Sequence, residues 1–265
     1  MRPASAVSVS SLHAKLSAPF PPTVVDVRRA AAYERDPVRI PLSIRRAPEA
    51  VEHWAAELDD WREVVVYCVH GHEVSANAAS ALAARGLRAS ILEGGLEAWR
   101  QAALPVAPSH TPTRWVTRER PKIDRIACPW LVRRFVDASA EFFYVPPQDV
   151  RAFARDRGAT PFDIPDVEYS HVGERCSFDA FVERHGNGNA ALARLADIVR
   201  AADTDTLGQS AQAAGLLAVS LGLGRGIADD AELLRRGMLV YDALYAWCAL
   251  AADERHGWNP AAIPA

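Results

Sequence analysis

The sequence predicts an α/β domain with a parallel sheet flanked by helices, followed by a mainly α-helical second domain with a few short strands. In the first half, short β-branched runs alternate with helical segments, a pattern typical of a parallel sheet covered by helices. In the second half, apolar residues recur every three to four positions, as they do in helices. Between the halves, residues 105–113 (PVAPSHTPT) hold three prolines, which favours a linker. We therefore expect domains at 1–108 and 114–265, joined by a linker at 109–113.

Three short runs in the first half are predicted to be buried strands because they are rich in valine and isoleucine. They are 23–27 (TVVDV), 63–68 (EVVVYC) and 89–92 (ASIL). Three segments with apolar residues at helical spacing are predicted helices: 48–58, 75–84 and 94–102. The helix at 75–84 is rich in alanine and is followed by a glycine, which is typical of a helix C-terminus.

The second half is predicted to be mostly helical. Helices are expected at 129–138, 147–157, 177–185, 190–202, 208–221 and 229–251, and a strand at 141–145 (EFFYV). The last helix has Asp229 and Asp230 at its start, where a carboxylate caps the backbone, and Cys248 on its apolar stripe, so we expect this cysteine in the core. The glycine-rich stretch 221–226 follows a helical segment rather than a strand, so it is expected to stop a helix and not to bind a nucleotide.

The composition disfavours several classes of protein. Hydrophobic residues make up 49% of the chain and charged residues 24%, with a formal net charge of −3. These values are typical of a folded chain and disfavour a dedicated nucleic-acid binder, which usually carries a basic face. No run approaches the roughly 18–20 uninterrupted apolar residues of a membrane helix, and the N-terminus lacks the apolar core of a secretion signal. The four cysteines are scattered without a CxxC motif, so we expect free thiols in a cytoplasmic, reducing compartment.

Cys68 ends a predicted strand and shortly precedes a predicted helix. In a parallel sheet this is the carboxyl edge, where ligands bind. The loop at 69–74 can turn its backbone N–H groups toward the sulfur, and the helix N-terminus adds positive charge, so both favour a thiolate. Gly71 lets the loop turn tightly, and Ser75 is expected to cap the helix. The alternative is a buried structural cysteine.

Three motifs around this cysteine resemble the rhodanese family over residues 8–108. They are Asp26-Val27-Arg28 after the first strand, YCVHGHEVS in the middle and LEGGLEAWRQAALPV at the end. The resemblance implies a rhodanese-like sheet domain whose loop cysteine, here Cys68, accepts a sulfane sulfur as a persulfide. It then passes the sulfur to a thiophilic acceptor such as a thiol, without a cofactor. Asp26 and Arg28 are expected to form a structural ion pair near the loop.

Two departures from the family bear on the sulfur donor. Residues 39–43 read Arg-Ile-Pro-Leu-Ser where family members usually have a His-Ile-Pro-Gly-Ala-like turn. Members that use thiosulfate tend to carry Arg or Lys in the loop, whereas this loop offers His70, His72 and Glu73. Because Glu73 repels a dianion, we expect a neutral small-molecule or protein-borne sulfane sulfur donor in preference to thiosulfate. His70 or His72 is a candidate proton-transfer partner; alternatively, both are solvated loop side chains.

Positive charge in the second half is concentrated in residues 114–134. This segment holds seven Arg or Lys and two acidic residues, whereas residues 135–265 hold 11 basic and 19 acidic ones. A local basic cluster in an acidic body suits a small oxyanion better than a long nucleic-acid track. Cys128 immediately precedes Pro129, and proline is favoured at the first helical position, so we expect Cys128 to cap the helix as a thiolate. The alternative is that it packs beneath Trp130. The candidate oxyanion-binding residues are Arg118, Arg120, Lys122, Arg125 and Cys128.

A second cluster contains His171, Glu174 and Cys176, three side chains of metal-binding type, together with the carboxylate of Asp179. Their spacing matches no zinc signature, but the set is a candidate site for a metal ion in the second domain. The alternative pairs Glu174 with Arg175 in a turn. The sequence leaves open whether Cys128 and Cys176 lie together as a redox pair.

Long blocks between residues 114 and 250 resemble the C-terminal domain of the chromate-resistance ChrB family. They are WVTRERPKIDRIACPWLVRRFVD, FFYVP, GATPFDIPDVEYSHVGERCSFDAFV, ADIVRAADT, QAAGLLAVSLGL and LVYDALYAWC. The two resemblances predict a sulfurtransferase with a Cys68 persulfide, fused to a domain that binds chromate, a similar oxyanion or a metal ion and acts in chromate resistance. A thiol beside bound chromate could also reduce it. Two alternatives are a chromate-responsive transcriptional regulator and a non-catalytic oxyanion- or metal-binding module.

Overall fold

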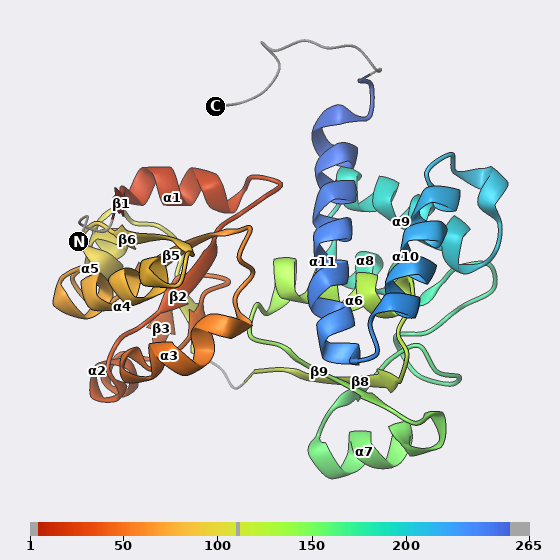
Figure 1. The fold of residues 1–265 in the computed structure, drawn as a ribbon, viewed down its shortest axis with the longest axis horizontal. Helices are drawn as coiled ribbons and strands as arrows, with labels where there is room; N and C mark the ends of the chain where they lie inside the picture. Colours follow the sequence, from red (N-terminus) through yellow and green to blue (C-terminus); the bar gives the residue numbers. More distant parts are fainter. Residues whose placement is uncertain (1–4, 110–111, 255–265) are drawn as a thin grey trace.

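A five-stranded parallel sheet forms the centre of the first half (Figure 1). The computed structural model describes residues 5–109 and 112–254, so residues 110 and 111 of the predicted linker lie outside the described part. The strand order is β1-β6-β5-β2-β4, and every neighbouring pair is parallel. The strands are β1 (Ser5–Val7), β2 (Thr23–Asp26), β4 (Ile44–Arg45), β5 (Glu63–Tyr67) and β6 (Arg88–Leu92). The three strands predicted for this half are β2, β5 and β6, each within one residue at either end.

Helices cover both faces of this sheet, as predicted. Successive side chains of a strand point to opposite faces, so Val64 and Val66 of β5 pack with α3 and α4, whereas Val65 packs with α1 and α5. The helices are α1 (Val9–Leu16), α2 (Ala30–Arg35), α3 (Val51–Trp54), α4 (Glu73–Ala84) and α5 (Gly95–Gln101), with 3-10 turns at Pro48–Ala50 and Ala55–Glu57 beside α3. A separate antiparallel pair joins β3 (Val38–Arg39) to β7 (Ala107–Pro108).

The second half is mainly helical with a few short strands, as predicted, and these strands form a small parallel sheet. The strands β8 (Arg114–Arg118), β9 (Glu141–Val145) and β10 (Thr160–Pro161) lie in the order β10-β8-β9. The helices are α6 (Asp124–Leu131), α7 (Val150–Arg157), α8 (Ser177–His185), α9 (Ala190–Asp203), α10 (Ala213–Gly226) and α11 (Asp230–Ala246). π turns at Val132–Val136 and Trp247–Ala251 extend α6 and α11, and 3-10 turns lie at Pro147–Asp149 and Leu207–Gln209. Side chains of α6, α8, α9 and α11 share one core, in which Trp130, Phe181, Leu195 and Tyr241 are buried. Cys248 is also buried there, as predicted.

The glycine-rich stretch 221–226 lies within a helix rather than stopping one, so the sequence prediction for it is wrong. It forms the last residues of α10, which begins at Ala213 and ends at Gly226. Leu223 within the stretch packs against the core. Burial of this face outweighs the low helix propensity of glycine.

The predicted start of the helix at Pro129 is also wrong. Helix α6 begins at Asp124, so Pro129 lies inside it and Cys128 is not a cap. A proline inside a helix leaves the carbonyl four residues earlier without its N–H partner. Here that carbonyl belongs to Arg125, and the hydroxyl of Tyr144 in β9 donates to it at 3.0 Å. This side-chain hydrogen bond explains how the helix continues through the proline.

Four charged side chains meet where the two halves contact each other. They are Asp59 and Arg62 from the first half and Arg134 and Asp242 from the second, here called the Asp242 cluster. Asp242 is 1% exposed and accepts hydrogen bonds from Trp130 Nε1 at 2.8 Å and from Arg134 Nε and Nη2 at 2.9 Å each. Arg62 Nη1 lies 3.9 Å from Asp242 Oδ2, and Arg134 Nη2 lies 3.4 Å from Asp59 Oδ2. A cavity of about 610 Å³ beside the cluster is lined by residues of both halves.

Among the residues that the structure describes, none of the helices combines the length and the apolar character that crossing a membrane requires.

Candidate functional site

Cys68 lies at the carboxyl end of β5, near the middle of the parallel sheet. β5 lies between β2 and β6, and the valines at 64–66 are fully buried on both sides. This buried strand places Cys68 at the edge of the sheet, just before the loop that leads into α4. The side chain is 7% exposed, so it is nearly covered yet still reaches solvent.

Hydrogen-bond donors surround the Cys68 sulfur. Burial on its own raises the pKa of the thiol, but the hydroxyl of Ser75 and the backbone N–H groups of Ser75, His70 and His72 hydrogen-bond to the sulfur. The balance lowers the pKa of Cys68 below its usual value, because these donors stabilise the thiolate. The arrangement is the amide-lined loop that the sequence predicts.

Ser75 does not cap α4, contrary to the sequence prediction. The helix begins at Glu73 with His72 as its N-cap, so Ser75 lies in the first turn and is fully buried. Its Oγ lies 3.0 Å from the carbonyl oxygen of His72 and 3.3 Å from Cys68 Sγ. The one hydroxyl proton can therefore point to the carbonyl or to a thiolate.

Two glycines allow the Cys68 loop to lie against the N-terminus of α5. Gly71 has φ +71° and Gly95 has φ +60°, values that L side chains rarely adopt. A Cβ on Gly95 would lie 2.5 Å from the carbonyl oxygen of Cys68 and 2.6 Å from the N of Gly71. The backbone N–H groups of Leu96 and Glu97 donate to the carbonyls of Cys68 and of the next residue, at 3.0 and 3.1 Å. These contacts fix the loop around the sulfur.

The remaining predicted loop residues are placed at the rim. The side chains of His70, His72 and Glu73 are all exposed, and the two imidazole rings lie 5.9 Å apart between centroids. The acidic side chain of Glu73 lies in the first turn of α4. A role in proton transfer for either histidine stays a prediction.

Asp26 and Arg28 form a buried ion pair, which the sequence predicts. Arg28 Nη2 lies 2.6 Å from Asp26 Oδ2, and both side chains are 1% exposed. Tyr67 Oη also donates to Asp26 Oδ2 at 3.0 Å, which ties the ends of β2 and β5 together. The pair therefore supports the strand that carries Cys68.

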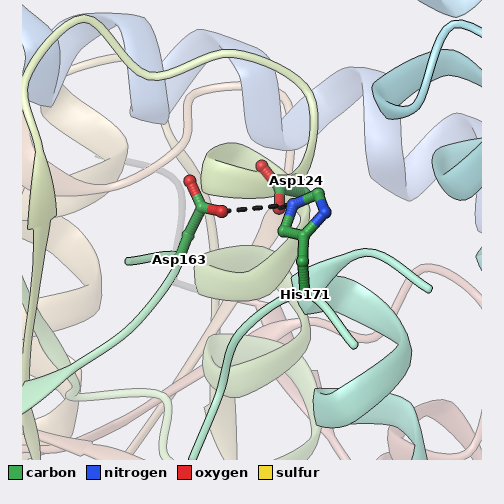
Figure 2. A group of neighbouring side chains, drawn as sticks. All are labelled: Asp124, Asp163 and His171. Carbon is green, nitrogen blue, oxygen red and sulfur yellow. Dashed lines mark ion pairs between the residues drawn. The ribbon is translucent and has the colours of Figure 1, made fainter. Parts of the chain in front are cut away.

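A second concentration of charged groups lies in the second half, around one imidazole nitrogen (Figure 2). Its members, here called the carboxylate–histidine cluster, are Asp124, Asp163, His171 and Asp203. His171 Nε2 lies 3.4 Å from Asp124 Oδ2, 3.3 Å from Asp163 Oδ1 and 3.2 Å from Asp203 Oδ2. The four residues come from the start of α6, the segment after β10, the segment before α8 and the last residue of α9.

The cluster gathers three carboxylates around one imidazole in a mostly buried place. Contact with Asp124 raises the pKa of His171 to about 9, with Asp203 and Asp163 acting in the same direction. Burial and the charge of Asp124 raise the pKa of Asp203 to about 7 and raise that of Asp163 as well. Two residues at the cluster have unusual backbones, with φ 34° at Ile123 and 53° at Asp163. Such conformations persist where surrounding structure holds them.

The structure divides the predicted oxyanion-binding residues into two groups. Arg118 and Arg125 pair with Asp163 Oδ2, at 2.6 and 3.2 Å, so they join the carboxylate–histidine cluster. Arg120 and the exposed Lys122 instead line a pocket of about 280 Å³ near the end of α10, together with Arg225. Arg225 carries no motif signal in the sequence and becomes a candidate through this placement alone.

Cys128, the fifth predicted oxyanion-binding residue, lies neither among the arginines that pair with Asp163 nor in the pocket near the end of α10. It is fully buried inside α6, and burial together with Asp124 and Cys176 raises its pKa. The predicted thiolate and its reduction of bound chromate therefore lose their physical basis. Cys176 is likewise fully buried, with a pKa raised by burial and by Asp124. Both cysteines are free thiols.

The predicted metal-binding set is changed by the structure. His171 belongs to the carboxylate–histidine cluster, whereas Glu174 is exposed to solvent. Cys176 lies near the cluster without being one of the residues gathered at the imidazole. Sequence reasoning missed the three aspartates because they are far apart in the chain. A signal existed, since each lies inside a block that carries the second resemblance.

Comparison with known proteins separates the two halves in the same way. Residues 115–248 match the family model described as ChrB, C-terminal domain, and residues 8–102 match the one described as Rhodanese-like domain. The chain is 34% identical over 144 residues to Protein ChrB of Cupriavidus metallidurans, covering 52% of this chain and 43% of that protein. This chain therefore spans less than half the length of that relative.

Solved structures similar to the first half include two with descriptive names. A rhodanese-related protein from Thermoplasma volcanium is 26% identical, covers 39% of this chain and 97% of that one, and has a TM-score of 0.35. A thiosulfate sulfurtransferase from Pseudomonas aeruginosa is 22% identical, covers 41% of this chain and 20% of that one, and has a TM-score of 0.36.

Proposed function

This chain belongs to the ChrB C-terminal domain family, and we propose that it joins a sulfur-carrying rhodanese domain to an oxyanion-binding domain that acts in chromate resistance. The observation that carries the first part is the environment of Cys68 Sγ. A hydroxyl and three backbone N–H groups converge on this sulfur and lower the pKa of its thiol. The same donors stabilise the terminal sulfur of a persulfide, which is also anionic near neutral pH.

Sulfur transfer at Cys68 takes two steps. The thiolate attacks the outer sulfur of a donor R–S–S⁻, the donor S–S bond breaks, and R–S⁻ leaves with the electron pair while Cys68–S–S⁻ forms. A thiol or cyanide acceptor then attacks the outer sulfur, and the Cys68 thiolate returns. Each step breaks one sulfur–sulfur bond. It forms another sulfur–sulfur bond, or a sulfur–carbon bond when cyanide is the acceptor, so no external oxidant or reductant is needed.

The donor is a persulfide or protein-borne sulfane sulfur rather than thiosulfate. The loop from Val69 to Val74 contains no Arg or Lys, and Glu73 adds an exposed negative charge at its rim. A dianion approaching this rim meets repulsion, whereas a neutral or singly charged donor meets less. The alternative function, a non-catalytic binding module, predicts that no donor gives sulfur transfer.

A cyanide-trapping assay tests this part of the proposal. The full chain is incubated with cysteine persulfide, which carries one net negative charge, or with thiosulfate, which carries two, and thiocyanate is measured. We expect transfer by the wild type, with the persulfide preferred, and loss of at least 99% of it in Cys68→Ala. Cys248→Ser, which changes a buried core thiol, serves as the matched control and keeps the activity. No thiocyanate from either donor in the wild type contradicts the sulfurtransferase.

The oxyanion-binding part rests on the pocket near the end of α10. Arg120, Lys122 and Arg225 bring three cationic side chains to its wall. Arg120 Nη1 donates to the carbonyls of Ile227 and Ala228, at 3.1 and 2.7 Å, which holds its charge in place. Chromate and sulfate are both tetrahedral dianions, so either can be held by such a group. Arg118 and Arg125 are less suited to this task, because both already pair with the carboxylate of Asp163.

Calorimetric titration with chromate tests this pocket. We expect Lys122→Ala and Arg225→Ala each to weaken chromate binding about tenfold, since each removes one charge contact worth about 1.4 kcal/mol. Arg155→Ala, an exposed arginine of α7, is the matched control and leaves binding unchanged. If Lys122→Ala and Arg225→Ala bind chromate as tightly as Arg155→Ala and the wild type, chromate does not bind in this pocket.

A further inference from the structure

We propose that the carboxylate–histidine cluster is a binding site for one divalent transition-metal ion, with Mn²⁺ as the ion that its ligands match best. The site differs from the metal ligands that the sequence suggests, because it keeps His171 and replaces the other two by aspartates. It is also independent of Cys68, which lies in the other half of the chain.

The first argument is an imbalance between donors and acceptors. His171 Nε2 can carry one proton, yet three carboxylate oxygens lie within 3.4 Å of it. One N–H donates one strong hydrogen bond. Because Asp163 Oδ1 also accepts from Ser177 Oγ at 3.0 Å, the imidazole leaves at least one of Asp124 and Asp203 without a donated proton. A dication placed among the ligand atoms of Asp124, Asp163 and His171, which lie within 4.8 Å of one another, satisfies both buried carboxylates, and Asp203 Oδ2 lies beside them, 3.2 Å from the imidazole.

The second argument is a buried oxygen that lacks a hydrogen bond. Asp124 is 2% exposed, and among the described residues no group donates to its Oδ2. This oxygen faces His171 across 3.4 Å (Figure 2). A buried carboxylate oxygen without a partner costs free energy. That cost is removed when a cation binds it.

The geometry fits a small cation. The ligand atoms of Asp124, Asp163 and His171 all lie within 4.8 Å of one another. Around an octahedral ion with bonds of about 2.1 Å, adjacent ligands lie about 3 Å apart and opposite ones about 4.2 Å apart. The measured separations fall close to this range, so modest side-chain movement is enough.

The surroundings hold the ligands in place and leave an entrance. Arg118 and Arg125 bind Asp163 Oδ2, and Ser177 Oγ donates to Asp163 Oδ1 at 3.0 Å. Such contacts orient a metal-binding carboxylate. Asp203 is the last residue of α9, where the helix dipole favours a cation. The side chain of His171 is 41% exposed, so an ion can enter and water can complete its coordination.

The chemistry of the donors selects the class of metal. Three carboxylate oxygens favour a hard cation, and one imidazole nitrogen favours a transition metal over Mg²⁺ or Ca²⁺. Mn²⁺ and Fe²⁺ accept both kinds of ligand. Neither Cys128 nor Cys176 is among the side chains whose ligand atoms gather at the imidazole, which disfavours a thiolate site for a soft metal.

Manganese binding to the full-length, EDTA-treated chain tests the proposal. Free Mn²⁺ is followed by electron paramagnetic resonance as protein is added, and thermal unfolding is followed with and without MnCl₂. We expect one ion per chain and a melting temperature that rises with Mn²⁺. Asp203→Asn is expected to weaken Mn²⁺ binding at least tenfold.

A matched control and a second variant complete the test. Glu174→Gln removes an exposed carboxylate of the same segment and leaves Mn²⁺ binding unchanged. Asp124→Asn is a second test of the site, and circular dichroism shows whether it folds; if it does not, Asp203→Asn at the rim decides. The proposal is wrong if the wild type shows no saturable Mn²⁺ binding, or if Asp203→Asn binds it as the wild type does.

Discussion

At the scale of single residues, the four cysteines fall into two kinds. The pKa of Cys68 is lowered by hydrogen bonds, whereas burial raises the pKa of Cys128, Cys176 and Cys248. Thiol reactivity follows the thiolate fraction and access. We therefore expect electrophiles and sulfur donors to react at Cys68 first.

The hydroxyl of Ser75 contributes part of the shift at Cys68. Because it hydrogen-bonds to the sulfur at 3.3 Å, its removal in Ser75→Ala weakens the thiolate and raises the pKa of Cys68. A hydrogen bond to a charged group is worth about 1.5 kcal/mol, or about one pH unit. The midpoint of the iodoacetamide rate against pH should move up by that amount, so alkylation at pH values below the midpoint slows about tenfold. Cys68→Ser gives the background from the other thiols, and an unchanged midpoint in Ser75→Ala contradicts the assigned role.

Gly95 and Gly86 provide a matched pair for the packing of the Cys68 loop. Both have positive φ, 60° and 85°, but a Cβ meets backbone within 2.6 Å at Gly95 and nothing within 4 Å at Gly86. Gly86→Ala should cost about 1 kcal/mol of unfolding free energy from backbone strain alone. Gly95→Ala should cost about 3 kcal/mol or more, because overpacking is added. Urea unfolding measures both values, and equal losses would show that the close approach at Gly95 is unimportant.

At the scale of elements, most of the fold follows from local sequence patterns. The strand at 141–145 and the helix at 177–185 have the predicted bounds, and β2, β5 and β6 are within one residue of theirs. α6 is misplaced in the prediction because the partner that accommodates Pro129, the hydroxyl of Tyr144, is distant in sequence. β8 is missed because an arginine at each end masks its short apolar centre. Distance along the chain also separates the two sites. The residues predicted around Cys68 are close in sequence, and the structure brings the loop and the sulfur together as expected, whereas the aspartates of the carboxylate–histidine cluster are far apart in sequence and were missed.

The contact between α6 and α11 can be tested with two helical glycines. A Cβ on Gly237 of α11 would lie 2.8 Å from Cγ2 of Ile126 in α6, whereas Gly222 in α10 has nothing within 4 Å. Gly222→Ala should stabilise the protein by about 0.5–1 kcal/mol through helix propensity. Gly237→Ala gains the same propensity but loses about 1–3 kcal/mol to overpacking, so it should be destabilising on balance. Urea denaturation compares the signs, and stabilisation by Gly237→Ala argues against tight contact of the two helices.

At the scale of the whole molecule, the two halves are joined by more than the linker. Asp242 holds Arg134 from its own half and lies near Arg62 from the other. Burial and the neighbouring Arg134 lower the pKa of Arg62 to about 10, which shows that positive charge is crowded there. The carboxylates of Asp242 and Asp59 balance it.

Asp242→Asn tests this junction. The change leaves two largely buried arginines with Asp59 as the one remaining carboxylate of the cluster. Breaking a buried ion pair costs about 3–5 kcal/mol, and Asp59 brings the expected loss toward the lower figure. We expect a correspondingly lower unfolding free energy, together with faster amide hydrogen exchange on both sides of the contact. Asp60→Asn, which removes an exposed carboxylate close by, should change neither. If amide hydrogen exchange becomes faster in the second half alone, the junction is not shared by the two halves.

The Asp242 cluster also decides how this protein can be dissected. Cutting the gene at the predicted linker would yield a rhodanese-like fragment in which Arg62 lacks the nearby carboxylate of Asp242. In the second fragment, Arg134 and Asp242 would face bulk water. Each fragment would then expose a surface that the intact chain keeps covered. Loss of activity or of metal affinity in a fragment would therefore reflect that new surface as much as Cys68 or the carboxylate–histidine cluster. Point substitutions in the uncut polypeptide are the informative experiments.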